Sequence, residues 1–154
     1  MSPRSIAADI DALNRELLAA YRPPASIDRH SEFIVAHSLV NEARQLDAAG
    51  LAHGALLRYL QAAMRSASLR GVTPVGPDVL AVKTGEFEAI LKQPGTDDSV
   101  GRLFLEAALS NAELGPFIAA DVFPRYIGAV GKAAVAAKVP PPQVTITLVR
   151  WPYT

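Results

Sequence analysis

The sequence contains no cysteine. This absence excludes disulfide bonds, thiolate metal sites, iron–sulfur clusters and a cysteine nucleophile. An excess of either charge is also missing, because 15 Lys+Arg balance 15 Asp+Glu and the formal net charge is zero. With no net field and no run of basic residues, we expect no nucleic-acid partner and no attraction to anionic lipid. A net charge near zero also removes one barrier to self-association.

Long uninterrupted apolar segments are missing too. The nearest candidate is residues 117–139, which are interrupted by Asp121, Pro124, Arg125 and Lys132. A membrane-spanning helix needs about 18 or more apolar residues, so we predict a buried helix here and no transmembrane segment. The first residues, MSPRSIAADIDALN, lack the apolar core of roughly 7–15 residues that defines a secretory signal. We therefore expect a cytoplasmic protein.

The motifs that carry most catalytic chemistry are also missing. The sequence has no G-x-S-x-G nucleophile turn, no G-x-G-x-x-G, no lysine-bearing phosphate loop and no H-E-x-x-H pair. His30 and His37 share one predicted helix face and His53 begins the next helix, an arrangement that could supply metal ligands in a helical bundle. His53 is expected near the turn at Gly50, far from His30, so we interpret all three as surface or capping residues. Asp97 and Asp98 are interpreted as helix caps. The sequence thus predicts no catalytic residue, no metal and no cofactor, and it favours a non-catalytic protein.

Apolar residues are abundant, at 50% of the chain, and alanine contributes much of that share. Ser5–Tyr21 has apolar residues three and four apart, which predicts a helix with Ile6, Ile10, Leu13, Leu17 and Tyr21 on one face. A second helix is predicted from a cap at Ser26 or Asp28 to about Ala49, with an apolar face of Phe33, Val35, Ala36, Leu39, Val40, Ala43 and Leu46. Gly50 should end it, and an antiparallel third helix should run from Ala52 to about Leu69. Apolar residues nearly encircle this third helix, so we expect it to be the most buried.

The second half of the chain begins with a loop rich in glycine and proline, residues 70–78. Residues 79–92 are predicted as a helix, with a short strand over Val79–Lys83 as the alternative. A further helix is expected from Ser99 to about Leu114, where Gly115 and Pro116 should break it. The last helix should run from Phe117 to about Lys138 and kink or begin afresh near Val122, because Pro124 lacks a backbone N–H.

The C-terminal tail has a different pattern from the rest. Residues 139–142 form a stiff proline-rich spacer, and residues 143–151 alternate as a strand does. The tail can fold back on residues 71–75 or 79–83, pair with the tail of a second copy, or dock on another protein. Its predicted contact residues are Val144, Ile146, Leu148, Trp151 and Tyr153. The predicted class is therefore mostly α, with five to six helices in antiparallel hairpins over residues 1–138 and a C-terminal β-strand tail over 139–154.

One stretch resembles a known family. In GLAHGALLRYLQA, the spacing of Gly50, Ala55, Tyr59 and Ala62 is similar to that of the second half of a tetratricopeptide hairpin. Leu39, Ala43 and Leu46 fit the first helix of that hairpin, whereas Glu42 and Ala67 stand where the family prefers leucine and proline. The resemblance covers residues 39–62, one hairpin. It implies protein binding rather than catalysis.

These patterns lead to a non-catalytic interaction or assembly subunit that uses its tail to form a homodimer or to dock on another protein. The alternative is a helical-bundle small-molecule-binding protein or enzyme with a pocket between the last helices, around Asp121, Arg125 and Tyr126. Asp121 lies among apolar residues and should pair with Arg125, four residues on. A third hypothesis is an apolar face within residues 117–139 that touches lipid or a quinone-like molecule.

Overall fold

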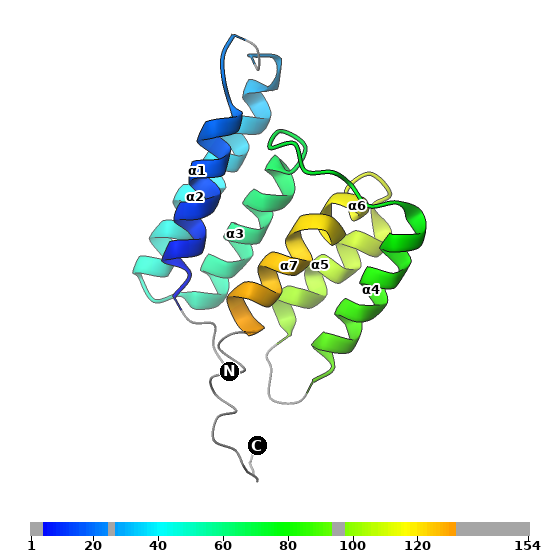
Figure 1. The fold of residues 1–154 in the computed structure, drawn as a ribbon. Coiled ribbons are helices and arrows are strands. Elements are labelled where there is room, and N and C mark those ends of the chain that lie inside the picture. The colour runs from blue at the N-terminus through cyan, green and yellow to red at the C-terminus, as the bar shows by residue number, and fades with distance from the viewer. Residues whose placement is uncertain (1–4, 25–26, 94–97, 132–154) are drawn as a thin grey trace.

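The computed structural model describes residues 5–24, 27–93 and 98–131. Over these ranges the protein is mostly helical and has no strand, which confirms the predicted helical class (Figure 1). In chain order the elements are α1 (Ala7–Ala20), the 3-10 helix η1 (Ile27–Arg29), α2 (His30–Ala48), α3 (Ala52–Ser66), α4 (Pro77–Leu91), α5 (Ser99–Ser110), α6 (Gly115–Phe117), the π-helix η2 (Ile118–Val122), α7 (Phe123–Tyr126) and the π-helix η3 (Ile127–Gly131).

The predicted C-terminal strand lies outside the described residues. The proline-rich spacer and the predicted contact residues Val144, Ile146, Leu148, Trp151 and Tyr153 lie outside them as well. The tail and its docking role therefore stay predictions.

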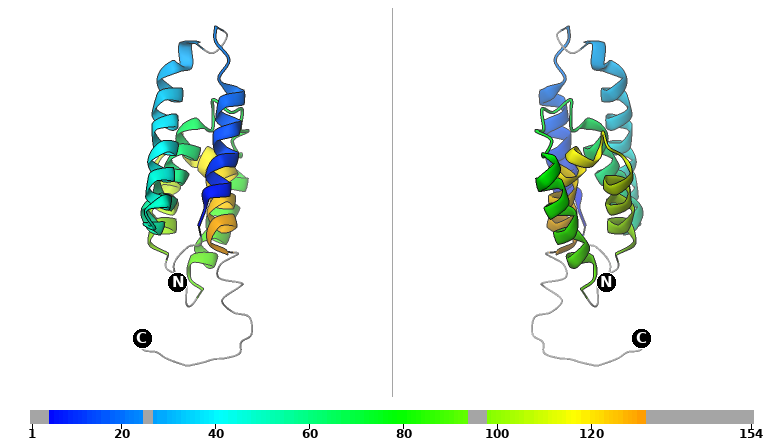
Figure 2. Two further views of the ribbon diagram at one scale, coloured as in Figure 1. Left: turned by 90° about the vertical axis from the view of Figure 1, so that its left-hand side faces the viewer. Right: turned by 90° about the vertical axis from the view of Figure 1, so that its right-hand side faces the viewer.

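Helices α1 and α2 lie at one edge of the molecule and α4 lies at the other, with α3, α5 and α7 between them (Figure 1). Seen from the side, the helices form two layers, with α1, α4 and α7 in one and α2 and α5 in the other (Figure 2). The start of α1 is tied to the end of α2, because Asp47 accepts hydrogen bonds from the Ser5 hydroxyl (3.0 Å) and the Ile6 N–H (3.2 Å).

Helices α2 and α3 form the predicted antiparallel hairpin. Gly50 has a φ of +79°, so it adopts the left-handed conformation that was expected to end α2. Helix α3 is the most buried helix of the described residues, as predicted, and it buries Ala55, Leu56, Tyr59, Leu60, Ala62, Ala63 and Ser66. The small side chains of Ala55, Ala62 and Ala63 let the neighbouring helices approach closely.

Two details of the predicted α2 are wrong. Val35 was placed on its apolar face, but this side chain is exposed, because Phe33, Ala36, Val40 and Ala43 already supply the contact with the core. Asp28 does not cap α2 either. The turn η1 precedes the helix, Arg29 occupies the capping position, and no side chain there bonds to the first backbone N–H groups.

Residues 79–91 are helical, which confirms the helix prediction and rules out a strand over Val79–Lys83. The helix begins at Pro77, whose fixed φ suits a first helical position, and Asp78 places negative charge in the first turn. Because these residues are helical, the tail cannot pair with them as a strand. The other proposed partner, residues 71–75, forms a loop whose Val75 N–H donates to the Pro116 carbonyl (3.2 Å).

Helix α5 ends at Ser110, earlier than the predicted Leu114. The reason is Asn111, whose side-chain oxygen accepts hydrogen bonds from the N–H groups of Glu113 (3.0 Å) and Leu114 (2.9 Å) and turns the chain. Gly115 then begins the next helix instead of breaking the last one. Asp98 precedes α5 but forms no capping bond, since its carboxylate pairs with Arg102 (2.8 Å).

The last helical segment changes from a π-helix to an α-helix next to Pro124. The α-helix begins afresh at Phe123, close to the predicted Val122, but it follows the π-helix η2 rather than a break. Pro124 has no N–H to offer the carbonyl of Ala120, and its ring crowds that carbonyl, so the wider π turn accommodates it. The N–H of Phe123 instead bonds to the carbonyl of Ile118.

Candidate functional site

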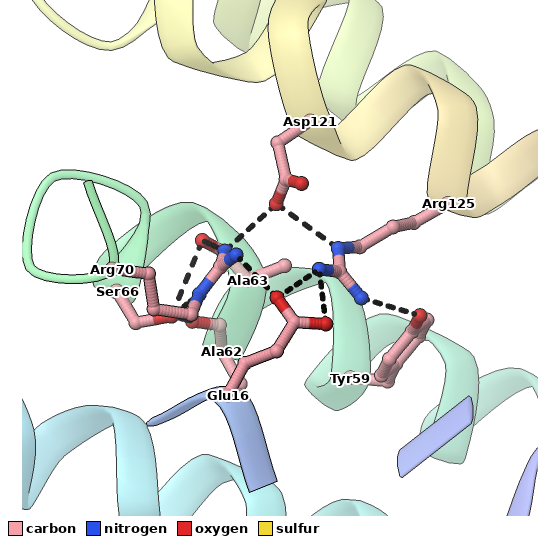
Figure 3. A network of polar contacts seen from close by, with 8 residues as sticks. All are labelled: Glu16, Tyr59, Ala62, Ala63, Ser66, Arg70, Asp121 and Arg125. Carbon is pink, nitrogen blue, oxygen red and sulfur yellow. Dashed lines mark hydrogen bonds and ion pairs between the residues drawn. The ribbon is translucent and has the colours of Figure 1, made fainter. Parts of the chain in front are cut away.

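A cluster of polar side chains joins α1, α3 and the last helical segment at the predicted pocket (Figure 3). We call it the polar cluster, and its members are Glu16, Tyr59, Ser66, Arg70, Asp121 and Arg125. Asp121 comes from η2 and Arg125 from α7, whereas Arg70 comes from the turn that follows α3. The cluster therefore connects parts of the chain that are far apart in the sequence.

Arg70 is the most buried charged member, with 4% of its side chain exposed. The turn after α3 ends at Gly71, whose φ is +79°, and the Arg70 side chain folds back along that helix. Its Nε donates to the Ser66 hydroxyl (2.8 Å) and its Nη2 donates to the Ala63 carbonyl (2.8 Å). The fully buried Ser66 hydroxyl itself donates to the Ala62 carbonyl (2.7 Å). Arg70 therefore satisfies the C-terminal end of α3, where positive charge is favoured.

Asp121 accepts from two arginines. Its Oδ2 lies 2.7 Å from Nη2 of Arg70 and 3.0 Å from Nε of Arg125. The predicted ion pair between Asp121 and Arg125 is confirmed. The contact with Arg70 could not be read from spacing, because the two residues lie 51 positions apart. The only local signal for it was a cation just after a helix end.

Arg125 has three different partners. Besides Asp121, its Nη1 donates to the Tyr59 hydroxyl oxygen (3.2 Å) and its Nη2 donates to Glu16 Oε1 (3.0 Å). Glu16 Oε1 also accepts from Nη1 of Arg70 (3.2 Å). Glu16 is 48% exposed, so it forms the solvent-facing side of the cluster, whereas the less exposed Asp121 forms its inner side.

The charges of the polar cluster cancel, since two guanidinium groups face two carboxylates. Burial raises the pKa of the Tyr59 phenol, although the hydrogen bond and the charge of Arg125 act to lower it. Burial acts to lower the pKa of Arg125, but the hydrogen bond to Tyr59 and the charge of Asp121 outweigh it and hold that pKa above its usual range. At neutral pH, Tyr59 therefore stays protonated and Arg125 stays charged.

This arrangement is better suited to holding helices together than to chemistry. Both arginines are directed at carboxylates and carbonyls of the same chain, so neither guanidinium is directed at an open cavity. The shared oxygen of Asp121 already accepts hydrogen bonds from two guanidinium groups. Tyr126, the third residue of the predicted pocket, lies away from the cluster. It is buried with its ring edge-on to Phe87 (5.3 Å between centroids).

A shallow depression lies on the other side of the last helical segment. It has a volume of about 90 Å³ and is lined by Lys83, Glu86, Phe87, Ile90, Ala119, Phe123, Pro124 and Ile127. Pockets that enclose drug-sized ligands usually have about 300–1,000 Å³. The depression is therefore too small for such a ligand, and it includes none of Asp121, Arg125 and Tyr126.

The histidines do not converge. The Nδ1 of His30 is hydrogen-bonded to the Tyr21 hydroxyl, and the ring of His37 stacks on Phe33 (5.4 Å between centroids). His53 is in the first turn of α3, at the far end of the hairpin from His30. Over residues 5–24, 27–93 and 98–131, no three His, Asp or Glu side chains gather as metal ligands would. Among the helices of that part of the chain, none combines the length and the apolar character needed to cross a bilayer.

Comparisons with known proteins add no further constraint. The chain matches no protein-family model, no curated protein and no solved structure.

Proposed function

We propose that this protein is a non-catalytic assembly or interaction subunit. The observation that carries the proposal is that Asp121 and Arg125, the two charged residues of the predicted pocket, are already bonded to other residues of the chain. Asp121 is held between Arg70 and Arg125, and Arg125 is further bonded to Glu16 and Tyr59. An enzyme or binding protein built on this pocket would need at least one of these groups directed at a ligand. The alternative function therefore loses its best candidate residues.

The C-terminal tail is the proposed docking element. Its alternating residues Val144, Ile146 and Leu148, followed by Trp151 and Tyr153, have the chemistry of a strand that adds to a partner. Tryptophan and tyrosine are enriched among residues that dominate interface energies. Within the described residues the helices offer no strand edge, so a strand-like tail would have to find its backbone partners on another chain.

The α2–α3 hairpin is proposed as a second contact surface of tetratricopeptide-like type. The buried Ala55, Tyr59 and Ala62 support the resemblance, since small residues and one aromatic fill the space between paired helices. The exposed Ile34 and Val35 lie on α2 and are available to a partner.

Light scattering on the full chain and on a truncation ending at Lys138 tests the role of the tail. If the tail mediates assembly, the full chain forms an oligomer or captures a partner and the truncation is a folded monomer with the same melting temperature. The variant Trp151→Ala in the full chain removes one proposed anchor without shortening the tail, and it should weaken the assembly partially. A truncation that unfolds would place the tail in the core and overturn its docking role.

A further inference from the structure

Helix α4 presents an unpartnered face at the edge of the molecule opposite α1 and α2 (Figure 1), and the right-hand view of Figure 2 faces that edge. We call this face the α4 stripe, and it consists of Val79, Val82, Lys83, Glu86 and Ile90. These positions are three and four residues apart, so they fall on one side of the helix. Val79 is 46% exposed and Val82 is 59% exposed.

The stripe is not the face that α4 needs for its own packing. Thr84, Phe87 and Leu91 are buried against the rest of the protein. The stripe lies beside that buried face and continues onto Ile127, which is 38% exposed and shares the shallow depression with Ile90. Exposed valine side chains along a helix, with a half-buried isoleucine and the exposed Ile127 beside them, are typical of a surface that another helix covers.

Two charged residues, Lys83 and Glu86, lie in the middle of the stripe. Lys83 and Glu86 form no ion pair with any residue of the described ranges. In the polar cluster, by contrast, each charge has a partner in the same chain. The open charges of α4 are therefore available to an outside partner.

The order of these residues is self-complementary. Lys83 and Glu86 flank the point between Thr84 and Gly85, and Val79 and Ile90 lie at equal distances on either side of the same point. If a second α4 is laid antiparallel across this point, each Lys83 faces a Glu86 and each Val79 faces an Ile90. Such matching of a surface with itself is the requirement for a two-fold symmetric dimer.

We infer that the α4 stripe is the interface through which a second copy of this chain binds, with the two α4 helices antiparallel. This inference rests on the proposed assembly function and supplies a partner for it. The net charge of zero adds no long-range repulsion between copies. The tail of the same chain fits this surface less well. A strand requires free backbone partners, and the backbone groups within a helix are already bonded to one another.

Charge reversal distinguishes this interface from other modes of assembly. In Lys83→Glu, each two-fold pair becomes Glu against Glu, and in Glu86→Lys it becomes Lys against Lys. We expect each single variant to weaken dimerisation about 10- to 100-fold, because two attractive contacts become repulsive. The double variant K83E/E86K restores opposite charges and should dimerise within about threefold of the parent. An equimolar mixture of the two single variants should form the heterodimer.

The variant Lys92→Glu is the matched control. It makes the same change in charge on the same helix, but Lys92 is beside Glu88 (3.9 Å) and away from the stripe, so dimerisation should not change. Sedimentation velocity over a concentration series measures all these variants, and circular dichroism confirms that each is folded. Single variants that dimerise as the parent does would overturn the inference. A mixture that forms no heterodimer, or a monomeric parent, would overturn it as well.

The truncation at Lys138 separates this inference from the role of the tail. If the truncated chain still dimerises and responds to the charge variants, the α4 interface stands without the tail. If truncation abolishes the dimer while the charge variants leave it intact, the tail is the interface and the α4 inference fails.

Discussion

The last helical segment, η2 and α7, is held in different ways on its two sides. On one side it meets α3 and the turn after it through the ion pair of Asp121 with Arg70 and the hydrogen bond of Arg125 to Tyr59, and Glu16 of α1 completes the contact. On the other side it meets α4 and α5 through aromatic packing, with Phe123 stacked on Phe87 at 4.0 Å and an interplanar angle of 7°. One side is fixed by directional bonds, and the other by buried apolar surface.

The two sides differ in what they specify. Apolar contact stabilises many arrangements, whereas a guanidinium bonded to named oxygens allows few. The polar side therefore sets the position of η2 against α3, and the aromatic side supplies burial. Helix α4 has its buried face on the aromatic side, and Lys83 and Glu86 of its stripe form no ion pair with any described residue, whereas Glu88 of the same helix lies 3.9 Å from Lys92. Paired charges fix contacts inside the described part of this molecule, and the charges of the α4 stripe are those that we assign to a contact with a second copy.

The largest expected effect comes from breaking the polar side at Arg70. The variant Arg70→Met keeps an unbranched apolar stem but removes the guanidinium group and its charge. Asp121 loses its shorter ion pair, and the Ala63 carbonyl and the Ser66 hydroxyl lose a donor. Removing one partner of a buried ion pair typically costs about 3–5 kcal/mol. We expect a loss of that size in the free energy of unfolding, measured by urea denaturation.

Arg44→Met is the matched control for this variant. Arg44 also pairs with an aspartate, at 2.8 Å from Asp11, but both side chains are about half exposed. Exposed ion pairs contribute about 0–1 kcal/mol, so this change should have little effect. Equal losses for the two variants would show that burial of the polar cluster adds no stability, and the contrast between the two sides would not hold.

A smaller effect is expected from disturbing the aromatic side at Gly101. A Cβ at this position would lie 2.5 Å from Leu91 Cδ2 and 2.8 Å from Tyr126 Cζ, and both side chains are buried. Gly101→Ala should therefore lower the free energy of unfolding by about 1–3 kcal/mol, the usual cost of overpacking a core. Chemical denaturation of both this variant and the parent provides the measurement.

Gly85→Ala makes the same change in a helix where there is space. Gly85 lies in α4, and nothing lies within 4 Å of its added Cβ. Alanine is the better helix former, so this variant should gain about 0.5–1 kcal/mol. If Gly101→Ala also stabilised the protein, the close approach of α5 to Leu91 and Tyr126 would not limit packing.

Much of the fold could be predicted from periodicity, and the site could be predicted only in part. The apolar spacing of α1 and the stop at Gly50 depend on neighbouring residues, so the sequence predicted both correctly. The pair of Asp121 and Arg125 lies four positions apart on one helical segment and was predicted for the same reason. Arg70 joins them only through the tertiary fold, and its place just after a helix end was the only local signal for it. The early end of α5 was missed because Asn111 outweighs the helix preference of the residues around it.

The smallest expected effect concerns Tyr59, and it tests whether the polar side is sensitive to pH. Tyr59→Phe removes the acceptor for Nη1 of Arg125 and should cost about 0.5–1.5 kcal/mol at pH 7.

The pH dependence of this variant follows from the raised pKa of Tyr59. The folded protein holds the phenol proton more tightly than the unfolded chain, whose tyrosine pKa is about 10. The stability that this difference supplies is therefore complete below about pH 10 and is lost as the pH rises from there through the folded-state pKa. Phenylalanine has no such proton, so the free energy of unfolding of Tyr59→Phe should fall less steeply with pH in that range, measured by urea denaturation at successive pH values. Parallel curves for the parent and the variant would mean that Tyr59 ionises equally easily in both states.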